Sequence, residues 1–196
     1  MGSGMRSNGW EHRIKKTRKH PRADPEKGSM FCQKRDEHKA NGRTIVFLDE
    51  SGFAHDRPRT HGYSLKGARC FGIHDWGAKG RTNVIGALLG SVLLTVSLRG
   101  TTINTQVFNA WMTQDLMPKL PKNSVVVMDN ATFHKGQDMI KALRSEGHTL
   151  LYLPPSSPDL NPIEKKWAQV KAIRRNIGGS VEALFKKNAI DQIVSA

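Results

Sequence analysis

Residues 45–53 read IVFLDESGF, and this stretch decides the fold prediction. Its first four residues are apolar, two of them β-branched and one aromatic, which is typical of a buried β-strand. The apolar run then stops at Asp49 and Glu50. We therefore predict a strand over residues 44–48 that ends at Asp49. A carboxylate in that position lies at the rim of the core, where it is partly shielded from water.

Two other stretches combine buried elements with a single acidic residue. Residues 125–134 read VVVMDNATFH, which predicts a strand over 124–128 that runs into Asp129. Residues 153–167 read LPPSSPDLNPIEKKW, which predicts a proline-rich turn and then a helix over about 161–176 with Glu164 in its first turn. Binding sites in open α/β sheets gather just beyond the carboxyl ends of strands. The two aspartates are expected at such ends.

The remaining elements complete an α/β pattern. Gly90 and Ser91 separate two apolar runs and predict a hairpin between them. The other predicted elements are strands over 83–89, 92–98 and 149–153, a short strand near 70–74, helices over 104–117 and 136–147, and a last helix capped by Ser180. Three consecutive strands followed by alternating helices and strands predict a mixed five-stranded sheet flanked by helices.

Charge is concentrated at the two ends of the 196-residue chain, whose formal net charge is +14. Residues 1–43 hold 12 Lys or Arg against 5 Asp or Glu, residues 44–164 hold 12 against 10, and residues 165–196 hold 7 against 2. This balance indicates a polyanionic partner, with nucleic acid first. We predict a flexible basic arm over 1–43, of which residues 1–4 are typical of a cloning remnant, and one folded domain over 44–196.

Several classes of protein are excluded by the pattern. The two cysteines, Cys32 and Cys70, lie in no CxxC motif, which favours reduced cytosolic thiols over a disulfide or a zinc site. No apolar run approaches the length of a membrane span, and no secretory signal is visible. A membrane partner is therefore not expected.

The three acidic residues make one chemical hypothesis together. Taken singly, Asp49 and Asp129 are ordinary turn residues and Glu164 is an ordinary exposed helix residue. Taken jointly, three carboxylates at one edge of a sheet repel each other, and a divalent cation removes that cost. Mg²⁺ prefers oxygen ligands, one or two carboxylates together with substrate phosphates. The combination with a basic chain favours a phosphoryl-transfer site.

The three quoted stretches, together with GYSLKGAR at 62–69, resemble the DDE transposases of the mariner-like superfamily, in its bacterial insertion-sequence branch. The resemblance covers residues 44–175, and the proline-rich turn into Asn-Pro-Ile-Glu is its most specific part. The 34 residues between Asp129 and Glu164 match the spacing familiar from this superfamily. The resemblance implies an RNase H-like fold and a DDE catalytic domain.

The resemblance also implies roles for the residues. Asp49 matches the first catalytic carboxylate, which bridges two metal ions, and Asp129 and Glu164 match the second and third. The implied cofactor is Mg²⁺ or Mn²⁺, with two ions that clamp the attacking and leaving oxygens of an in-line displacement. Water frees a 3′-hydroxyl at the transposon end, and that hydroxyl then attacks target DNA. The implied setting is the bacterial cytoplasm at the nucleoid, with a homodimer or larger assembly on DNA.

Further candidate residues surround the three carboxylates. Asn130 and His134 follow Asp129, where they either orient a ligand or cap the next segment. Asn161 is expected to cap the helix that carries Glu164 and so to fix its rotation. Glu50 is expected to point away from Asp49, and Trp167 to lie in the core. The candidate DNA-binding residues are Arg57, Arg59, Arg69, Lys79, Arg81, Lys165, Lys166, Lys171, Arg174 and Arg175.

One departure from the family limits what the chain is expected to do. Family members carry helix-turn-helix DNA-binding domains before the catalytic domain, whereas residues 1–43 show no such pattern. We therefore expect a fragment, a second reading frame of a split gene or a degenerate copy, in which the recognition of the transposon ends is in doubt. The alternative functions are a structure-selective nuclease on the same fold and a non-catalytic DNA-binding or assembly remnant of a transposase.

Overall fold

The computed structural model describes residues 23–55, 80–130, 136–177 and 180–185. Its centre is a five-stranded sheet in the order β3-β2-β1-β4-β5. The strands are β1 (Ile45–Ala54), β2 (Arg81–Leu89), β3 (Val92–Arg99), β4 (Val125–Met128) and β5 (Thr149–Tyr152). β1, β2 and β3 pair antiparallel, whereas β4 pairs parallel with both β1 and β5. The predicted mixed five-stranded sheet is confirmed.

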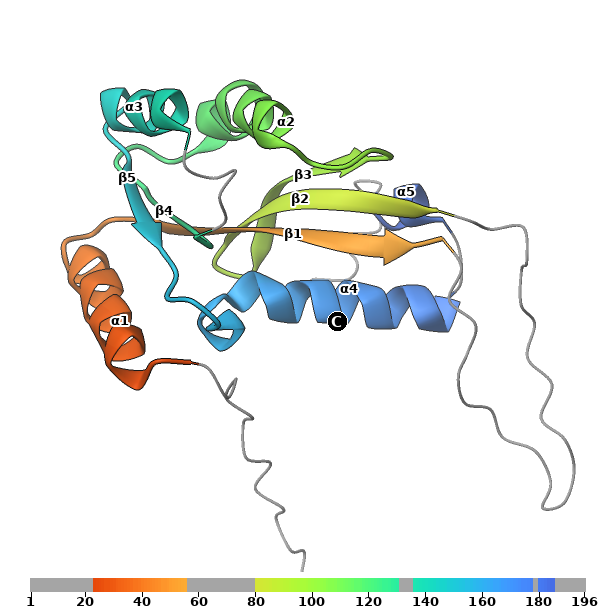
Figure 1. The fold of residues 1–196 in the computed structure, drawn as a ribbon, viewed down its shortest axis with the longest axis horizontal. Coiled ribbons are helices and arrows are strands. Elements are labelled where there is room, and N and C mark those ends of the chain that lie inside the picture. Colours follow the sequence, from red (N-terminus) through yellow and green to blue (C-terminus); the bar gives the residue numbers. More distant parts are fainter. Residues whose placement is uncertain (1–22, 56–79, 131–135, 178–179, 186–196) are drawn as a thin grey trace, which may run out of the picture.

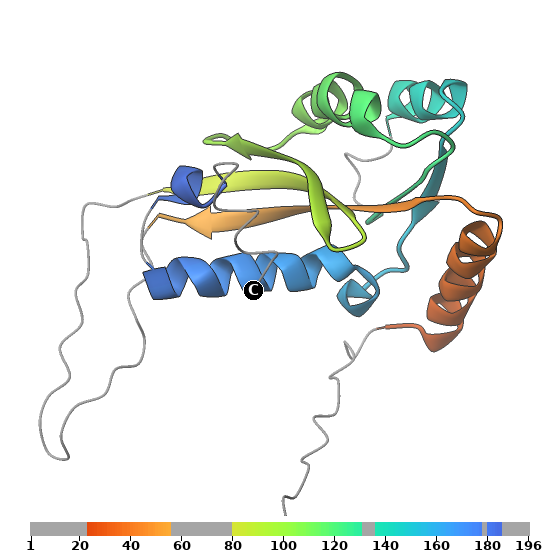
Figure 2. The ribbon, with the colours of Figure 1, turned by 180° about the vertical axis from the view of Figure 1, so that it is seen from behind.

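Helices cover both faces of the sheet, as Figures 1 and 2 show from opposite sides. One face carries α2 (Thr105–Trp111), the π-helical turn η1 (Met112–Leu116), the 3₁₀ turn η2 (Met117–Lys119) and α3 (Gln137–Ser145). The other carries α1 (Pro25–Ala40), the 3₁₀ turn η4 (Pro158–Leu160), α4 (Pro162–Ile177) and α5 (Val181–Leu184). Within the described residues, no helix combines the length and the apolar character needed to cross a bilayer.

Strand alternation divides the core between these two faces. Val46 and Leu48 of β1 point to the face of α2 and α3, where they pack with Phe108, Trp111 and other buried residues. Phe47 and Phe53 point to the opposite face, against α4 and α5. Because successive side chains of a strand point to opposite faces, Asp49 lies on the α4 face and Glu50 on the α2 face.

The central strand differs from its prediction. β1 does not end before Asp49 but continues to Ala54, so that Asp49 is in the middle of the strand. The cause is β2, which pairs with β1 along its whole polar half, from Val46 opposite Leu89 to Ala54 opposite Arg81. Backbone hydrogen bonds to a neighbouring strand do not depend on side-chain polarity, so the apolar run underestimates the strand.

The basic arm predicted over residues 1–43 contains a packed helix. Pro25–Ala40 form α1, which begins at an Asp24 cap whose side chain accepts from the backbone N–H groups of Glu26 and Lys27. The side chain of Phe31 is only 4% exposed and packs with Val125, Val127 and Leu153. Packing therefore starts before Thr44. The short helix expected around residues 10–19 lies outside the described residues.

Phe31→Ala is expected to destabilise the protein by about 3 kcal/mol, because it removes a buried aromatic ring from between α1 and the sheet. Met30→Ala is the matched control: the neighbouring side chain is 57% exposed, and its loss should cost less than about 0.5 kcal/mol. Urea unfolding of both variants measures the difference. Equal stabilities would show that the buried ring of Phe31 contributes nothing to the fold.

Candidate active site

Asp49 is the most deeply placed of the three candidate carboxylates. It lies in the middle of β1, opposite Gly86 of β2, and its side chain is partly buried beneath α4. Burial raises the pKa of the Asp49 carboxyl to about 8, with further contributions from the negative charges of Glu164, Glu50 and Asp129. Among the described residues, no positive charge contributes to this shift of the Asp49 pKa.

Asp129 follows the last residue of β4 and is exposed. Phe47 of β1 is paired with Val127 of β4 in parallel register, so Asp49 and Asp129 both lie two residues further along adjacent strands. Asp129 therefore stands at the strand end that its sequence predicted, and its charge adds to the pKa shift of Asp49. Asn130 follows it as an exposed residue, whereas His134 lies outside the described residues.

Glu164 occupies the first turn of α4 and is exposed. Asn161, which is only 4% exposed, does not cap this helix with its side chain as expected, because its Oδ1 has no hydrogen-bond partner among the described residues. Its Nδ2 instead donates to the carbonyl oxygen of Leu48 at 3.3 Å and so ties the helix start to β1. Its backbone carbonyl accepts from the N–H of Glu164 at 3.2 Å. The helix start is thus tied to the residue directly before Asp49, which brings the charge of Glu164 close to that carboxyl.

The three carboxylates share one face of the sheet, but they do not form a closed metal cage. Among the described residues, no group of three or more His, Cys, Asp or Glu side chains is gathered tightly enough to hold a metal ion. Like charges repel without a cation between them, and two of the three side chains are exposed. Three carboxylates, one with a raised pKa, still provide the hard oxygen donors that fit Mg²⁺ or Mn²⁺.

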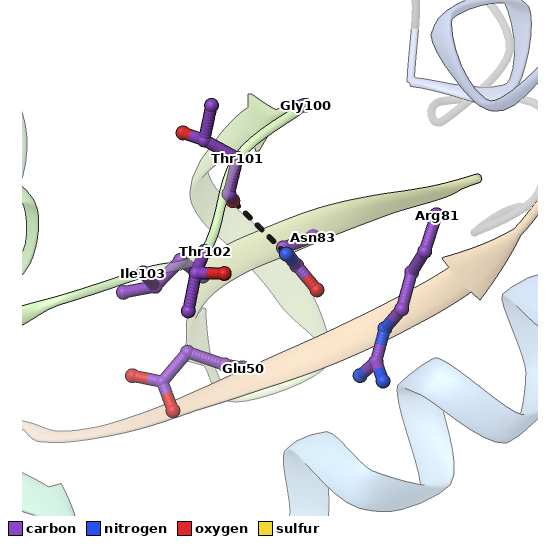
Figure 3. Close-up of a pocket in the computed structure, with 7 residues that line it drawn as sticks. All are labelled: Glu50, Arg81, Asn83, Gly100, Thr101, Thr102 and Ile103. Atoms are coloured by element: carbon purple, nitrogen blue, oxygen red, sulfur yellow. Dashed lines mark hydrogen bonds between the residues drawn. The ribbon is translucent and has the colours of Figure 1, made fainter.

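A second polar site lies on the opposite face of β1. Glu50, Arg81 and Asn83 line a cavity of about 690 Å³ with the segment 100–103, as Figure 3 shows. Asn83 Nδ2 donates to the carbonyl oxygen of Thr101 at 3.0 Å. Glu50 thus points away from Asp49, as expected. Arg81 reaches across Gly52, where a Cβ atom would come within 1.6 Å of its Nε.

The basic residues of α4 have different surroundings. Arg174 donates from Nη1 to the carbonyl oxygen of Ala54 at 2.6 Å and from Nη2 to that of His55 at 3.0 Å. Its guanidinium therefore binds the backbone at the end of β1. Lys171 Nζ lies 5.2 Å from the centre of the Phe53 ring. The side chains of Lys165 and Arg175 are exposed and that of Lys166 is partly buried. The candidates Arg57, Arg59, Arg69 and Lys79 lie outside the described residues.

Sequence reasoning missed two features of this site. Arg174 was grouped with phosphate-binding residues, and nothing in its local sequence reveals the contact with β1. Gly86 lies inside the strand predicted over 83–89, and a glycine inside a strand often marks a close approach by another group. Here that group is the indole of Trp167, which was expected in the core and is 1% exposed.

The central sheet of this α/β domain carries Asp49 in β1 and Asp129 just beyond β4, with Glu164 at the start of α4. Residues 44–184 match the model of the DDE superfamily endonuclease family, and the chain belongs to this family. A comparison with curated proteins found no match.

Solved structures similar to this fold are those of Mos1 transposase. The Mos1 paired-end complex with left transposon end has a TM-score of 0.67 at 18% identity, over 100% of this chain and 60% of the other. The mariner Mos1 paired end complex with Mg has a TM-score of 0.63 at 18% identity, with coverages of 100% and 60%. The catalytic domain of Mos1 mariner transposase gives 0.55 at 16% identity, with coverages of 87% and 80%.

These likenesses establish the fold. The mixed five-stranded sheet flanked by helices matches the RNase H-like fold of Mos1 transposase, as the sequence resemblance implied. The chain spans about 60% of the length of the first of these relatives.

Proposed function

We propose that this chain is the catalytic part of a DNA transposase of the bacterial insertion-sequence branch, which cuts phosphodiesters at transposon ends and joins them to target DNA. The observation that carries the proposal is the partly buried Asp49 carboxyl, whose pKa is raised by burial and by the charges of Glu164, Glu50 and Asp129. Such repulsion is costly in a resting protein. The same negative charges become favourable when a cation and a substrate phosphate bind beside them.

The metal site would consist of Asp49, Asp129 and Glu164. It would hold two ions, either Mg²⁺ or Mn²⁺. When bound, such ions stabilise the attacking and leaving oxygens of an in-line displacement. In the first step a water oxygen attacks the phosphorus, the bond to the 3′-oxygen breaks, and a free 3′-hydroxyl remains. In the second step that hydroxyl attacks a phosphorus of target DNA and displaces its 3′-oxygen.

The other residues of the site have supporting roles in this proposal. Asn161 keeps Glu164 near Asp49 through its bond to Leu48. Asn130 and His134, next to Asp129, are candidates for orienting ligands. Lys165 and Arg175 expose positive charge on the helix that carries Glu164, which suits contact with DNA phosphates. The remaining basic candidates stay predicted DNA contacts: Lys166, Lys171, Arg174, Arg81 and the residues at 57, 59, 69 and 79.

The partner of this chemistry is DNA, and the net charge of +14 supports it. The solved Mos1 complexes include paired transposon ends, and we infer that this chain also acts as a homodimer or larger assembly on DNA. Its place of action would be the bacterial cytoplasm, at the nucleoid.

The proposal is tested by cleavage and strand transfer on DNA that carries the sequences on either side of the gene as candidate transposon ends. Purified wild type with Mg²⁺ or Mn²⁺ should cut such ends and join a pre-cut 3′-hydroxyl end to a plasmid. Asp129→Asn should reduce both reactions on the order of 1,000-fold, because one metal-binding carboxylate is lost. Asp159→Asn is the matched control, since it removes an exposed carboxylate from the turn before α4.

Each alternative gives a different result in this assay. Cleavage without joining would identify a nuclease of the same family rather than a transposase. DNA binding that is unchanged by Asp129→Asn, with no cleavage in either metal, would identify a non-catalytic DNA-binding or assembly protein. Equal cleavage by wild type and Asp129→Asn would place the active site elsewhere.

A further inference from the structure

We propose that Gly86 and Trp167 form a packing key that positions α4 on the sheet and thereby sets the distance between Glu164 and Asp49. The indole of Trp167 is seated on the α-carbon of Gly86. This inference deepens the proposed function and rests on it, because it takes the three carboxylates as the metal site.

The contact itself is unusually close for a strand and a helix. A Cβ atom built on Gly86 would lie 2.5 Å from Cη2 and 2.8 Å from Cζ2 of Trp167, distances that real Cβ atoms do not show. Gly86 is not required by its backbone, since its φ is outside the left-handed region. The glycine is therefore explained by the ring that occupies the place of its side chain.

The position of the key links it to the carboxylates. Gly86 is the direct partner of Asp49 in the antiparallel ladder, and such partners point to the same face with Cβ atoms about 4.5–5.5 Å apart. Trp167 follows Glu164 by three residues on α4, so the two side chains lie on adjacent turns of the helix. A shift of α4 that moves the indole away from Gly86 therefore also moves Glu164 away from Asp49.

The indole has little room to move aside. It is 1% exposed, and it meets the rings of Phe53 and Phe185 edge to face at centroid distances of 6.4 and 6.3 Å. Within the described residues its Nε1 has no hydrogen-bond partner. Packing against neighbouring groups therefore fixes the position of the ring. On the N-terminal side of Glu164, the hydrogen bond from Asn161 to Leu48 holds the helix.

The size of the clash decides its consequence. Relief of the contact from 2.5 Å to an ordinary 3.4 Å requires a shift of about 1 Å. Metal–ligand distances in proteins tolerate only about 0.2 Å. A methyl group at position 86 is thus expected to lower the stability of the fold moderately and to weaken metal binding.

The test compares Gly86→Ala, Trp167→Phe and the double variant with wild type. Gly100→Ala is the matched control, because it makes the same chemical change where no atom lies within 4 Å. Two quantities are measured: the melting temperature in EDTA, and the affinity for Mn²⁺ alone by isothermal titration calorimetry at pH 8.5. The first reports packing without metal, and the second reports the site without DNA.

Gly86→Ala should lower the melting temperature by about 4–8 °C and the Mn²⁺ affinity by about 10–100-fold. Adding Trp167→Phe, which shortens the ring over position 86, should return the affinity to within about fivefold of wild type. Gly100→Ala should change neither quantity. If Gly86→Ala folds only in the Trp167→Phe background, the double variant must bind Mn²⁺ to within about fivefold of wild type, and weaker binding would overturn the inference.

Two results would overturn the inference. The first is a Gly86→Ala protein that loses stability but binds Mn²⁺ as wild type does, which reduces the pair to a packing contact. The second is an effect of Gly86→Ala that Trp167→Phe leaves unchanged, in melting temperature and in affinity alike. Wild type that binds no Mn²⁺ would instead overturn the proposed function and the metal site on which the key acts.

Discussion

Asp49→Asn is expected to abolish metal-dependent DNA cleavage and, at the same time, to stabilise the metal-free protein at pH 9. Cleavage should fall on the order of 1,000-fold or more, because the variant loses the carboxylate whose pKa the charges of Glu164 and Asp129 raise. Stability should rise because asparagine fills the same volume without a charge. At pH 9 the wild-type carboxylate is ionised in a partly buried place beside like charges.

Opposite changes in activity and stability distinguish this role from a structural one. Substitution of a residue that merely supports the fold lowers both activity and stability. Substitution of a functional residue that destabilises the fold lowers activity alone. The measurements are cleavage and Mn²⁺ binding at pH 8.5 and thermal unfolding in EDTA at pH 9. Asp159→Asn serves as the exposed control. A destabilised Asp49→Asn protein, or one that still cuts DNA, would contradict the assignment.

The contribution of Asp49 to the stability of the metal-free wild type is expected to fall as the pH rises from 4 to 9. The pKa of Asp49 is raised in the folded state to about 8 from an ordinary value of 3.8, by burial and by its acidic neighbours. The folded protein therefore binds this proton more tightly than the unfolded chain. The resulting stabilisation is fully present below about pH 4 and is lost as the pH passes 8, with a magnitude on the order of 5 kcal/mol.

Other groups give the opposite slope, so the comparison must isolate Asp49. Burial lowers the pKa of the His148 imidazole, and its contribution to stability is lost as the pH falls. The pKa of Asp115 is also lowered: burial opposes its charge, but hydrogen bonds from Lys119 and Thr95 outweigh this. Subtracting the profile of Asp49→Asn from that of wild type removes these shared contributions.

The difference profile is measured by urea unfolding in EDTA at intervals between pH 5 and pH 9. Wild type should lose stability relative to Asp49→Asn by about 1.4 kcal/mol per pH unit between pH 5 and pH 7, and the loss should level off above pH 8. Added Mn²⁺ should raise the melting temperature of wild type at pH 8.5 and much less at pH 5, where protons compete for the carboxylate. Parallel profiles for the two proteins would show that Asp49 titrates normally.

Much of the sheet could be predicted because its signals are local. Apolar runs located β2, β3, β4 and β5 to within a few residues, and Gly90 with Ser91 marked the hairpin that the structure contains. The start of α4 followed from Pro162, which fits the first turn of a helix. These elements depend on patterns that span fewer than about fifteen residues.

The remaining features depend on contacts between distant parts of the chain. β1 extends to Ala54 because β2 supplies pairing partners about thirty residues away. α1 has no amphipathic pattern, and it packs through Phe31 on strands that follow much later. Arg174 meets the end of β1 only once α4 lies across the sheet. These contacts could not be predicted from the local sequence pattern, because their partners are distant along the chain.

The sequence by itself predicted three candidate carboxylates and determined the order of the elements that carry them. Residue type and spacing follow the chain, so they can be read along it. Only the tertiary structure decided that Asp49 lies within a strand, that its neighbours raise its pKa, and that Asn161 ties α4 to β1. Burial and electrostatic coupling arise from distances across the sheet, and those distances exist only after the chain has folded.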